Sequence, residues 1–157
     1  MFGKFNEKIM KKVALIFSCL AFALVDKGQS PTFKKDAESL EGSMRTWTQK
    51  HGYAQQMKFN LSNDGSFYAL PDKDYVVFYV YDINPKSRVD FKAFLMTPVD
   101  SLKKKYSSSP YEVGISNSAK AEVLQFFTYS LGGAKQLPVK LEATPKARMY
   151  IYNRRRS

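Results

Sequence analysis

The feature that most limits the possible folds is one change of hydrophobic period near residue 52. Before it, apolar residues recur at alternating spacings of four and three, namely Phe33, Ala37, Leu40, Met44 and Trp47. That spacing places them on one stripe of an amphipathic helix. After residue 52 apolar side chains mostly alternate with polar ones, which is the period of a β-strand. The chain is therefore expected to fold as one helix followed by strands.

We predict that the helix spans residues 31–51. Ser30 and Pro31 match the preferred N-cap residue and the preferred first helical residue. Gly52 matches the residue type that most often follows the end of a helix. The apolar stripe of this helix needs a cover, and a sheet face is the simplest one.

Seven or eight short strands are expected after the helix. The strongest is Tyr75–Tyr81 (YVVFYVY), because β-branched and aromatic residues favour strands. Ser62–Ser66 and Thr144–Lys146 are predicted to be turns, and Asp64-Gly65 is a hairpin signal. The predicted strands are 57–61, 67–70, 75–81, 89–95, 111–115, 122–129, 137–143 and 147–152. The expected fold class is mainly β: an antiparallel β-sandwich or barrel with one N-terminal amphipathic helix.

The first 25 residues predict export. Lys4, Lys8, Lys11 and Lys12 precede thirteen uncharged residues, Val13–Val25. A basic segment followed by a short apolar stretch is typical of a secretory signal peptide. Thirteen helical residues span about 20 Å, which is less than the roughly 30 Å hydrocarbon core of a bilayer.

Three fates of this segment remain open. The sequence Ala21-Phe22-Ala23 fits a signal-peptidase site, whereas Ile16-Phe17-Ser18-Cys19 is a loose lipobox in which Cys19 would be lipidated. Alternatively, residues 9–25 are retained as a hydrophobic membrane anchor. The predicted organisation is 1–23 signal peptide or membrane anchor, 24–30 linker, 31–153 a single helix-plus-β-sandwich domain and 154–157 a basic tail.

The charge balance suggests a partner that carries negative charge. The 157 residues include 25 Lys and Arg against 14 Asp and Glu, a net charge of +11. Such a surplus attracts anionic lipid headgroups or acidic polysaccharide. Lys, Arg and aromatic residues also bind single-stranded nucleic acid, but an exported protein rarely meets that ligand, so nucleic acid is not the expected partner.

Residues suited to catalysis are few, and we predict that the chain is not an enzyme. One Cys and one His exclude an internal disulfide and a Cys/His zinc site within one chain, and no cofactor is expected. His51 stands at the predicted helix end without a nucleophile motif. Asp64, Asp72, Asp74 and Asp82 could bind Ca²⁺ or act as an acid–base pair, but Asp is also the usual turn residue.

Tyrosine and arginine side chains instead predict a binding face. Arg148, Tyr150, Tyr152 and Arg154 alternate along one face of the last predicted strand. Tyr79 and Tyr81 share a face of the strand 75–81, which we expect to be half exposed. Flat apolar rings with polar tips beside Arg are common at protein interfaces.

Together these features predict a small exported, non-catalytic binding or accessory protein, which is periplasmic, secreted or lipid-anchored. Its Tyr/Arg face would meet a protein partner or an anionic surface of the cell envelope. One alternative is an accessory subunit of a membrane-bound assembly that retains its N-terminal hydrophobic helix. A second alternative is an exported hydrolase that uses the loop aspartates.

Overall fold

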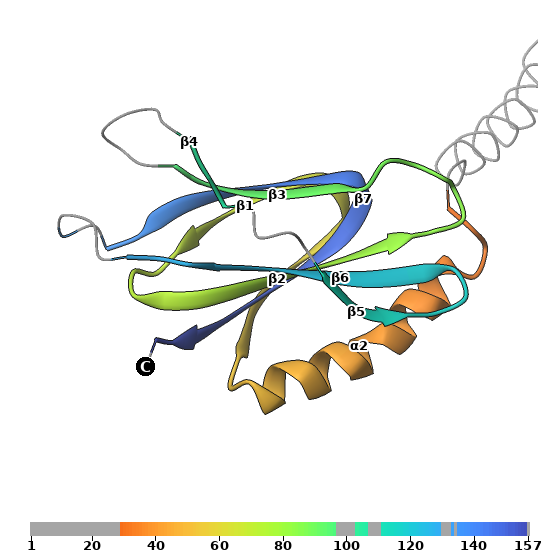
Figure 1. Cartoon of the computed structure of the whole chain (residues 1–157), viewed down its shortest axis with the longest axis horizontal. Helices are drawn as coiled ribbons and strands as arrows, with labels where there is room; N and C mark the ends of the chain where they lie inside the picture. The colour runs from red at the N-terminus through yellow and green to blue at the C-terminus, as the bar shows by residue number, and fades with distance from the viewer. Residues whose placement is uncertain (1–28, 97–102, 107–110, 130–132, 134, 157) are drawn as a thin grey trace, which may run out of the picture.

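The computed structural model describes residues 29–96, 103–106, 111–129, 133 and 135–156. These residues form one helix and seven strands that pair antiparallel in a single sheet (Figure 1). The elements are α2 (Phe33–Lys50), β1 (Ala54–Ala69), β2 (Lys73–Asp82), β3 (Asp90–Met96), β4 (Lys103–Tyr106), β5 (Tyr111–Ile115), β6 (Ala119–Phe127) and β7 (Leu137–Arg155). The prediction of a mainly β fold with one N-terminal helix is confirmed.

The long strand β7 lies at the centre of the sheet and pairs with three other strands. β1 pairs with one edge of β7 along almost its whole length. On the other edge, β2 pairs with residues 147–155 of β7 and β3 pairs with residues 139–144. β6 and then β5 extend the sheet beyond β2, and β4 extends it beyond β3.

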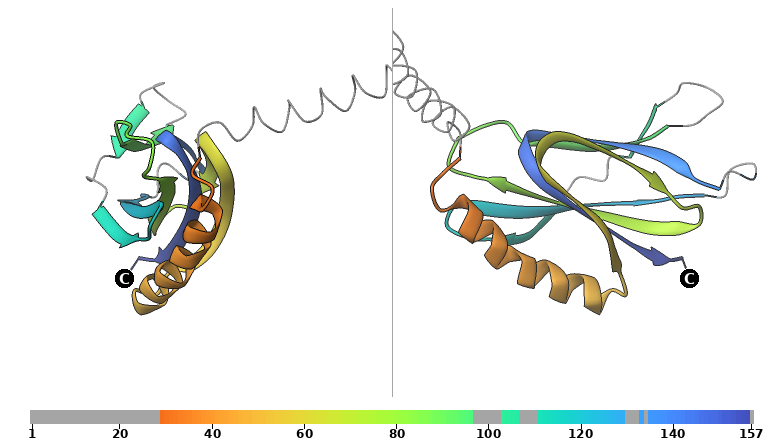
Figure 2. Two further views of the ribbon diagram at one scale, coloured as in Figure 1. Left: turned by 90° about the vertical axis from the view of Figure 1, so that its right-hand side faces the viewer. Right: turned by 180° about the vertical axis from the view of Figure 1, so that it is seen from behind.

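The sheet curls on itself but stays open (Figure 2). Its two halves share the ribbon of β1 and β7, and they meet through the larger core. The ring of Tyr79 in β2 stacks on that of Phe91 in β3 with centroids 4.4 Å apart. No pairing joins β4 to β5 in the described part of the chain. The expected sandwich or barrel is thus corrected to one curled sheet, because two uninterrupted strands run through both halves.

Both segments predicted to be separate turns lie inside these long strands. Ser62–Ser66 belongs to β1, and Thr144–Lys146 belongs to β7. The two segments face each other: Ser62 pairs with Ala147, and Asp64 pairs with Glu142. Between these pairs β7 advances by more residues than β1, which produces an irregularity that bends the ribbon.

Gly65 lies at this bend and explains the failed hairpin prediction. A Cβ atom added at Gly65 would lie 3.1 Å from Cδ2 of Phe59, closer than ordinary side-chain contacts. The glycine therefore accommodates a ring packed across the bend. The predicted hairpin at Asp64-Gly65 is wrong, since β1 continues through it.

The remaining strands lie close to their predicted positions, with one exception. β4 falls within residues 97–110, a stretch in which the sequence predicted no strand. Its sequence begins with three lysines, Lys103–Lys105, which lack the alternation of a half-buried strand. Lysine-rich strands are typical of sheet edges, and β4 lies at an edge.

Helix α2 covers one face of the sheet with the predicted stripe. Phe33, Ala37, Leu40 and Met44 are buried. They pack against residues of β2, β6 and β7, namely Val76, Phe78, Val80, Ala119, Ala121, Val123, Tyr150 and Tyr152. Gly52 follows the helix with a φ of +72°, as predicted. The helix begins at Phe33 and not at residue 31, with Thr32 as its N-cap.

Polar groups at the N-terminal end of α2 are satisfied inside the protein. The buried carboxylate of Asp36 accepts hydrogen bonds from the Ser118 N–H (3.0 Å), the Ser118 hydroxyl and the Ser116 hydroxyl (3.2 Å). The bond from the Ser118 hydroxyl is the largest cause that lowers the pKa of Asp36. Asp82 similarly accepts the backbone N–H groups of Ser30 and Asn84. These contacts tie the start of α2 to the sheet.

Candidate binding surface

The tyrosines that we predicted to form a binding face are core residues. Tyr150 and Tyr152 lie beneath α2 and are 3% and 8% exposed. Tyr79 and Tyr81 lie on the opposite face of the sheet, in the larger core, and are 0% and 4% exposed. The expected half-exposed tyrosine face is thus corrected, because the helix covers one set of rings and the curl of the sheet covers the other.

The hydroxyl groups of Tyr79, Tyr81 and Tyr150 have partners within the protein. Tyr150 donates to Oε1 of Glu41 (2.6 Å), which also accepts from Nζ of Lys58 (3.0 Å). Tyr79 donates to the carbonyl oxygen of Lys92 (3.1 Å). Burial, and then the charge of nearby Glu122, raises the pKa of Tyr81 to about 12. These groups are internal contacts and not part of an exposed surface.

The two predicted arginines stand at opposite ends of the covered face. The guanidinium carbon of Arg148 lies 5.7 Å from the ring centroid of Phe33 at the start of α2. Arg154 lies beside the other end of the helix, and its side chain is 39% exposed. Only the ends of the predicted face therefore reach solvent.

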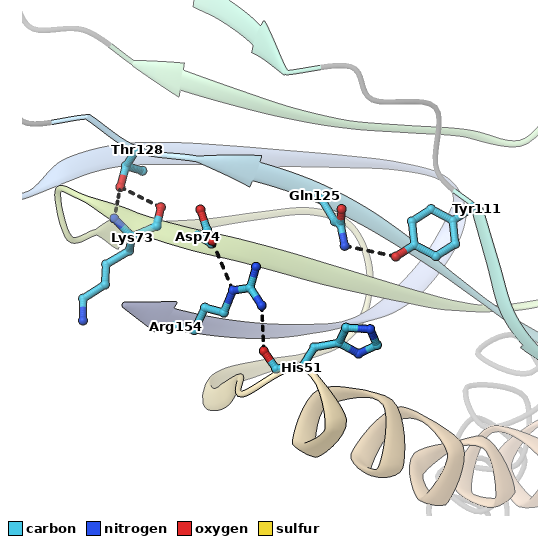
Figure 3. A network of polar contacts seen from close by, with 7 residues as sticks. All are labelled: His51, Lys73, Asp74, Tyr111, Gln125, Thr128 and Arg154. Carbon is cyan, nitrogen blue, oxygen red and sulfur yellow. Dashed lines mark hydrogen bonds and ion pairs between the residues drawn. The ribbon is translucent and has the colours of Figure 1, made fainter. Parts of the chain in front are cut away.

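Arg154 joins the sheet to the C-terminal end of α2 (Figure 3). Its Nε donates to Oδ2 of Asp74 (3.1 Å), and its Nη1 donates to the carbonyl oxygen of His51 (2.8 Å). Its guanidinium also lies over the ring of Tyr53, 4.6 Å from the centroid. This arginine therefore combines a cation–π contact with hydrogen bonds to a carboxylate and a carbonyl.

Next to Arg154 lies a group of exposed side chains that the sequence did not single out. Phe127 and Tyr129 are 37% and 42% exposed, and their rings meet edge to face with centroids 4.8 Å apart. The guanidinium carbon of Arg156 lies 4.8 Å from the Phe127 centroid and 5.4 Å from that of Tyr129. We define the aromatic–arginine surface as Tyr53, Phe127, Tyr129, Arg154 and Arg156.

Strand register makes this surface continuous. Phe127 of β6 pairs with Asp74 of β2, and Asp74 pairs with Arg154 of β7. The three side chains thus follow one another across three neighbouring strands, on the face that α2 covers farther along. Beyond Phe127, Gln125 donates to the hydroxyl of Tyr111 on β5 (3.0 Å), and Tyr111 is 43% exposed (Figure 3).

Thr128 fixes the outward orientation of the two rings. Its backbone N–H donates to the carbonyl oxygen of Lys73 (2.9 Å), and its hydroxyl donates to that of Leu70 (2.6 Å). The Lys73 N–H in turn donates to the Thr128 hydroxyl (3.1 Å) (Figure 3). Because adjacent side chains of an extended segment point in opposite directions, buried Thr128 leaves Phe127 and Tyr129 on the outer side.

Acidic side chains near the sheet are largely engaged in ion pairs. The acids in the ion pairs between described side chains are Glu41, Asp74, Asp90, Glu112, Glu122 and Glu142. None of these pairs involves Arg155 or Arg156. Positive charge therefore remains at the aromatic–arginine surface.

The four loop aspartates do not gather in one cluster, although Asp72, in the turn before β2, is two residues from Asp74. Asp74 and Asp82 lie at opposite ends of β2, about 26 Å apart for an extended strand. Asp64 lies in β1 at the bend of the ribbon. Within the described ranges, no group of three His, Cys, Asp or Glu side chains could hold a metal ion.

His51 has a local role at the end of α2. Its ring stacks on that of Trp47 with centroids 4.2 Å apart. Its Nδ1 lies 2.7 Å from the carbonyl oxygen of Trp47. The imidazole thus contributes to the helix end, as the sequence position suggested.

Some predictions lie outside the described residues. They concern the signal peptide or anchor 1–23, the hydrophobic segment 9–25, Cys19 and the linker up to residue 28. In the part of the chain with described structure, no helix has both the length and the apolar character needed to span a membrane. At the other end, β7 continues to Arg155, so Arg154 and Arg155 belong to a strand and not to a tail.

Comparisons of this chain with protein-family models, with curated proteins and with solved structures found no match. Its function is therefore inferred from its sequence and its surface.

Proposed function

We propose that this chain is a small exported, non-catalytic binding or accessory protein whose contact surface is the aromatic–arginine surface. The observation that carries this proposal is the stacking of Arg156 on two exposed rings, Phe127 and Tyr129. Rings that stay in water add little to a core, so packing does not account for them. Aromatic and arginine side chains are enriched at protein interfaces, because they combine a large contact area with polar groups.

One feature supports export, and a second suits a chain whose preceding segment is held at a membrane. The first is the basic and then apolar pattern of residues 1–25. The second is the direction of the domain: residue 30 precedes the start of α2, and Arg154 bonds to the carbonyl oxygen of His51 at the far end of the helix. Figure 1 shows the C-terminal end of β7 near that end of α2. The 18 residues of α2 separate the two by about 27 Å. A preceding segment held at a membrane would thus leave the contact surface facing away from it.

The same direction suits the alternative of a subunit that keeps its hydrophobic segment in a membrane-bound assembly. The hydrolase alternative gains no support from a cluster of its aspartates, because Asp82 lies at the end of β2 opposite to Asp74, while Asp72 lies in the turn just before β2. A protein partner is the favoured ligand, and an anionic envelope surface is the second candidate. The location proposed is the periplasm, the cell envelope or the extracellular space.

Intact mass spectrometry of the protein from its native cell tests the export proposal. A mass beginning at Leu24 would support cleavage and a soluble exported domain. A mass beginning at Cys19 with added acyl chains would support a lipoprotein. A full-length mass would overturn processing and favour the membrane-assembly alternative.

Site-specific photo-crosslinking in the native cell tests the contact surface. A photoreactive phenylalanine analogue replaces Phe127, and the matched control carries it at Tyr68, which is 67% exposed on β1. A discrete crosslinked product from position 127 and none from position 68 is the expected result. Equal products from both positions, or none from either, would overturn this assignment of the surface.

A further inference from the structure

The guanidinium of Arg156 lies close to two exposed aromatic rings and has no carboxylate partner among the described side chains. Two aromatic rings lie within 4.8 and 5.4 Å of its central carbon. A cation–π contact does not use up the N–H donors of a guanidinium, which can still form hydrogen bonds. No ion pair between described side chains uses these donors.

Arg154 shows that an arginine beside an aromatic ring can also bind a carboxylate in this protein. It lies 4.6 Å from the ring centroid of Tyr53 and donates from its edge to the carboxylate of Asp74. Arg156 lies two residues later on the same face, with a similar stacking distance. The two arginines differ in one respect: Arg154 bonds to a carboxylate of its own chain, and no such ion pair is described for Arg156.

We propose that Arg156 binds a carboxylate of another protein, and that the partner of the aromatic–arginine surface is an acidic segment with apolar side chains beside its Asp or Glu residues. This inference rests on the proposed binding function and names the chemistry of its partner. A planar guanidinium binds a carboxylate through two parallel N–H···O hydrogen bonds. The exposed edges of Phe127 and Tyr129 provide apolar contact for the neighbouring side chains of the partner.

Charge complementarity requires the partner to be acidic. Arg155 follows on the other face of β7, and the register places Lys73 of β2 opposite to it. Arg154 already has Asp74, so its charge is balanced locally. The end of the sheet thus carries positive charge around Arg156, which favours approach of a negatively charged segment.

Geometry favours a protein segment over the other anionic partners. A lipid surface that anchors the preceding chain would lie at the far end of α2, about 27 Å away. A polysaccharide would need the open faces of aromatic rings, but Arg156 already stacks on Phe127 and Tyr129. An acidic peptide needs only the N–H donors of the guanidinium and the exposed parts of the rings.

Fluorescence anisotropy with the chain purified from its native cell tests this inference. The probe is a labelled peptide of repeating Glu-Leu-Asp-Phe, and the control peptide has Gln and Asn in place of Glu and Asp. We expect Arg156→Ala to weaken binding of the acidic peptide by about tenfold or more. Arg156→Lys should recover only part of this loss, because an ammonium group lacks the planar pair of donors.

Arg88→Ala is the matched control, because it removes the same charge from an exposed loop at the other end of β2. It should change the affinity by less than about twofold, since distant surface charges are screened by salt. Equal losses for Arg88→Ala and Arg156→Ala would overturn the inference in favour of nonspecific attraction. Equal binding of the two peptides would overturn the assignment of a carboxylate.

Further ligands separate failure of this inference from failure of the proposed function. The same variants are tested with phosphatidylglycerol vesicles and with alginate. Binding to either that depends on Arg156, without binding of the acidic peptide, would overturn the protein partner but keep a binding function. If none of these ligands binds, the inference is overturned, and crosslinking at Phe127 then decides whether the surface has any partner.

Discussion

The two ends of α2 meet the sheet through different chemistry. At the N-terminal end, the Asp36 carboxylate accepts hydrogen bonds from Ser116 and Ser118 within the protein. At the C-terminal end, Arg154 bonds to Asp74 and to the His51 carbonyl, whereas the contacts described for Arg156, two residues later, are with two aromatic rings. Polar groups satisfied internally stabilise a fold, and an ordered charge without such a partner is suited to binding another molecule.

A second contrast lies along the covered face of the sheet. Phe78 of β2 is 0% exposed beneath α2, and its ring meets Trp47 and Tyr152 edge-on. Phe127 of β6 lies on the same face beyond the helix and is 37% exposed. Two phenylalanines on one sheet face thus have different roles, because the helix ends between them.

The largest expected effect sharpens this contrast. Phe78→Ala removes a fully buried ring and should lower the free energy of unfolding by about 4 kcal/mol. Phe127→Ala is its matched control and should cost less than about 1 kcal/mol. Chemical denaturation of both variants measures the difference. Similar losses for the two would mean that Phe127 belongs to the core, and the contrast would fail.

A smaller loss of stability is expected at the N-terminal end of α2. Asp36→Asn weakens the bonds from Ser116 and Ser118 at neutral pH. Because hydrogen bonds to the carboxylate lower the pKa of Asp36, its contribution to stability exists above about pH 4 and is lost as the pH falls through the folded-state pKa. The gap between wild type and variant in denaturation midpoint should therefore narrow in acid.

The control for this pH effect is Glu38→Gln, which changes an exposed acid on the same helix. It should leave the denaturation midpoint nearly unchanged at both pH values. A gap between Asp36→Asn and wild type that stays constant down to about pH 3 would contradict the role of the carboxylate charge.

These expectations also show what local sequence could predict. The helix stripe, the stop at Gly52 and the strong strand near Tyr75–Tyr81 depend on neighbouring residues, and all three are found in the structure. The bend of the ribbon depends on pairing between Ser62–Ser66 and residues 140–147, which lie about eighty positions apart. The sequence contained both turn signals, but it did not show that the two segments pair with each other.

The candidate site was predictable only in part, for a similar reason. Alternation placed Tyr150, Tyr152 and Arg154 on one face, and the structure agrees. Alternation does not say how much of that face a helix will cover. Comparing the length of α2 with that of the strands would have indicated uncovered positions, and Phe127 and Tyr129 occupy such positions.

A modest effect is expected where Arg154 joins the helix end to the sheet. Arg154→Ala removes the bonds to Asp74 and to the His51 carbonyl, together with the stacking on Tyr53. The loss should be about 1 kcal/mol, since 39% of the arginine side chain remains in solvent and screens the ion pair. A double-mutant cycle with Asp74→Asn should give a coupling of about 0.5 kcal/mol. Zero coupling would mean that the ion pair between Arg154 and Asp74 does not stabilise the C-terminal end of α2.

The smallest effect on stability should come from Arg156. Arg156→Ala should change the free energy of unfolding by less than about 0.5 kcal/mol, because stacking on exposed rings gains little over hydration. Chemical denaturation beside Arg154→Ala provides the comparison, since both variants lose a stacked arginine from one strand face. If Arg156→Ala destabilised the protein as much as Arg154→Ala, Arg156 would be a structural residue. The contrast between the two ends of α2 would then fail. A stable variant that loses binding of the acidic peptide would instead mean that folding does not require this arginine and that partner recognition does.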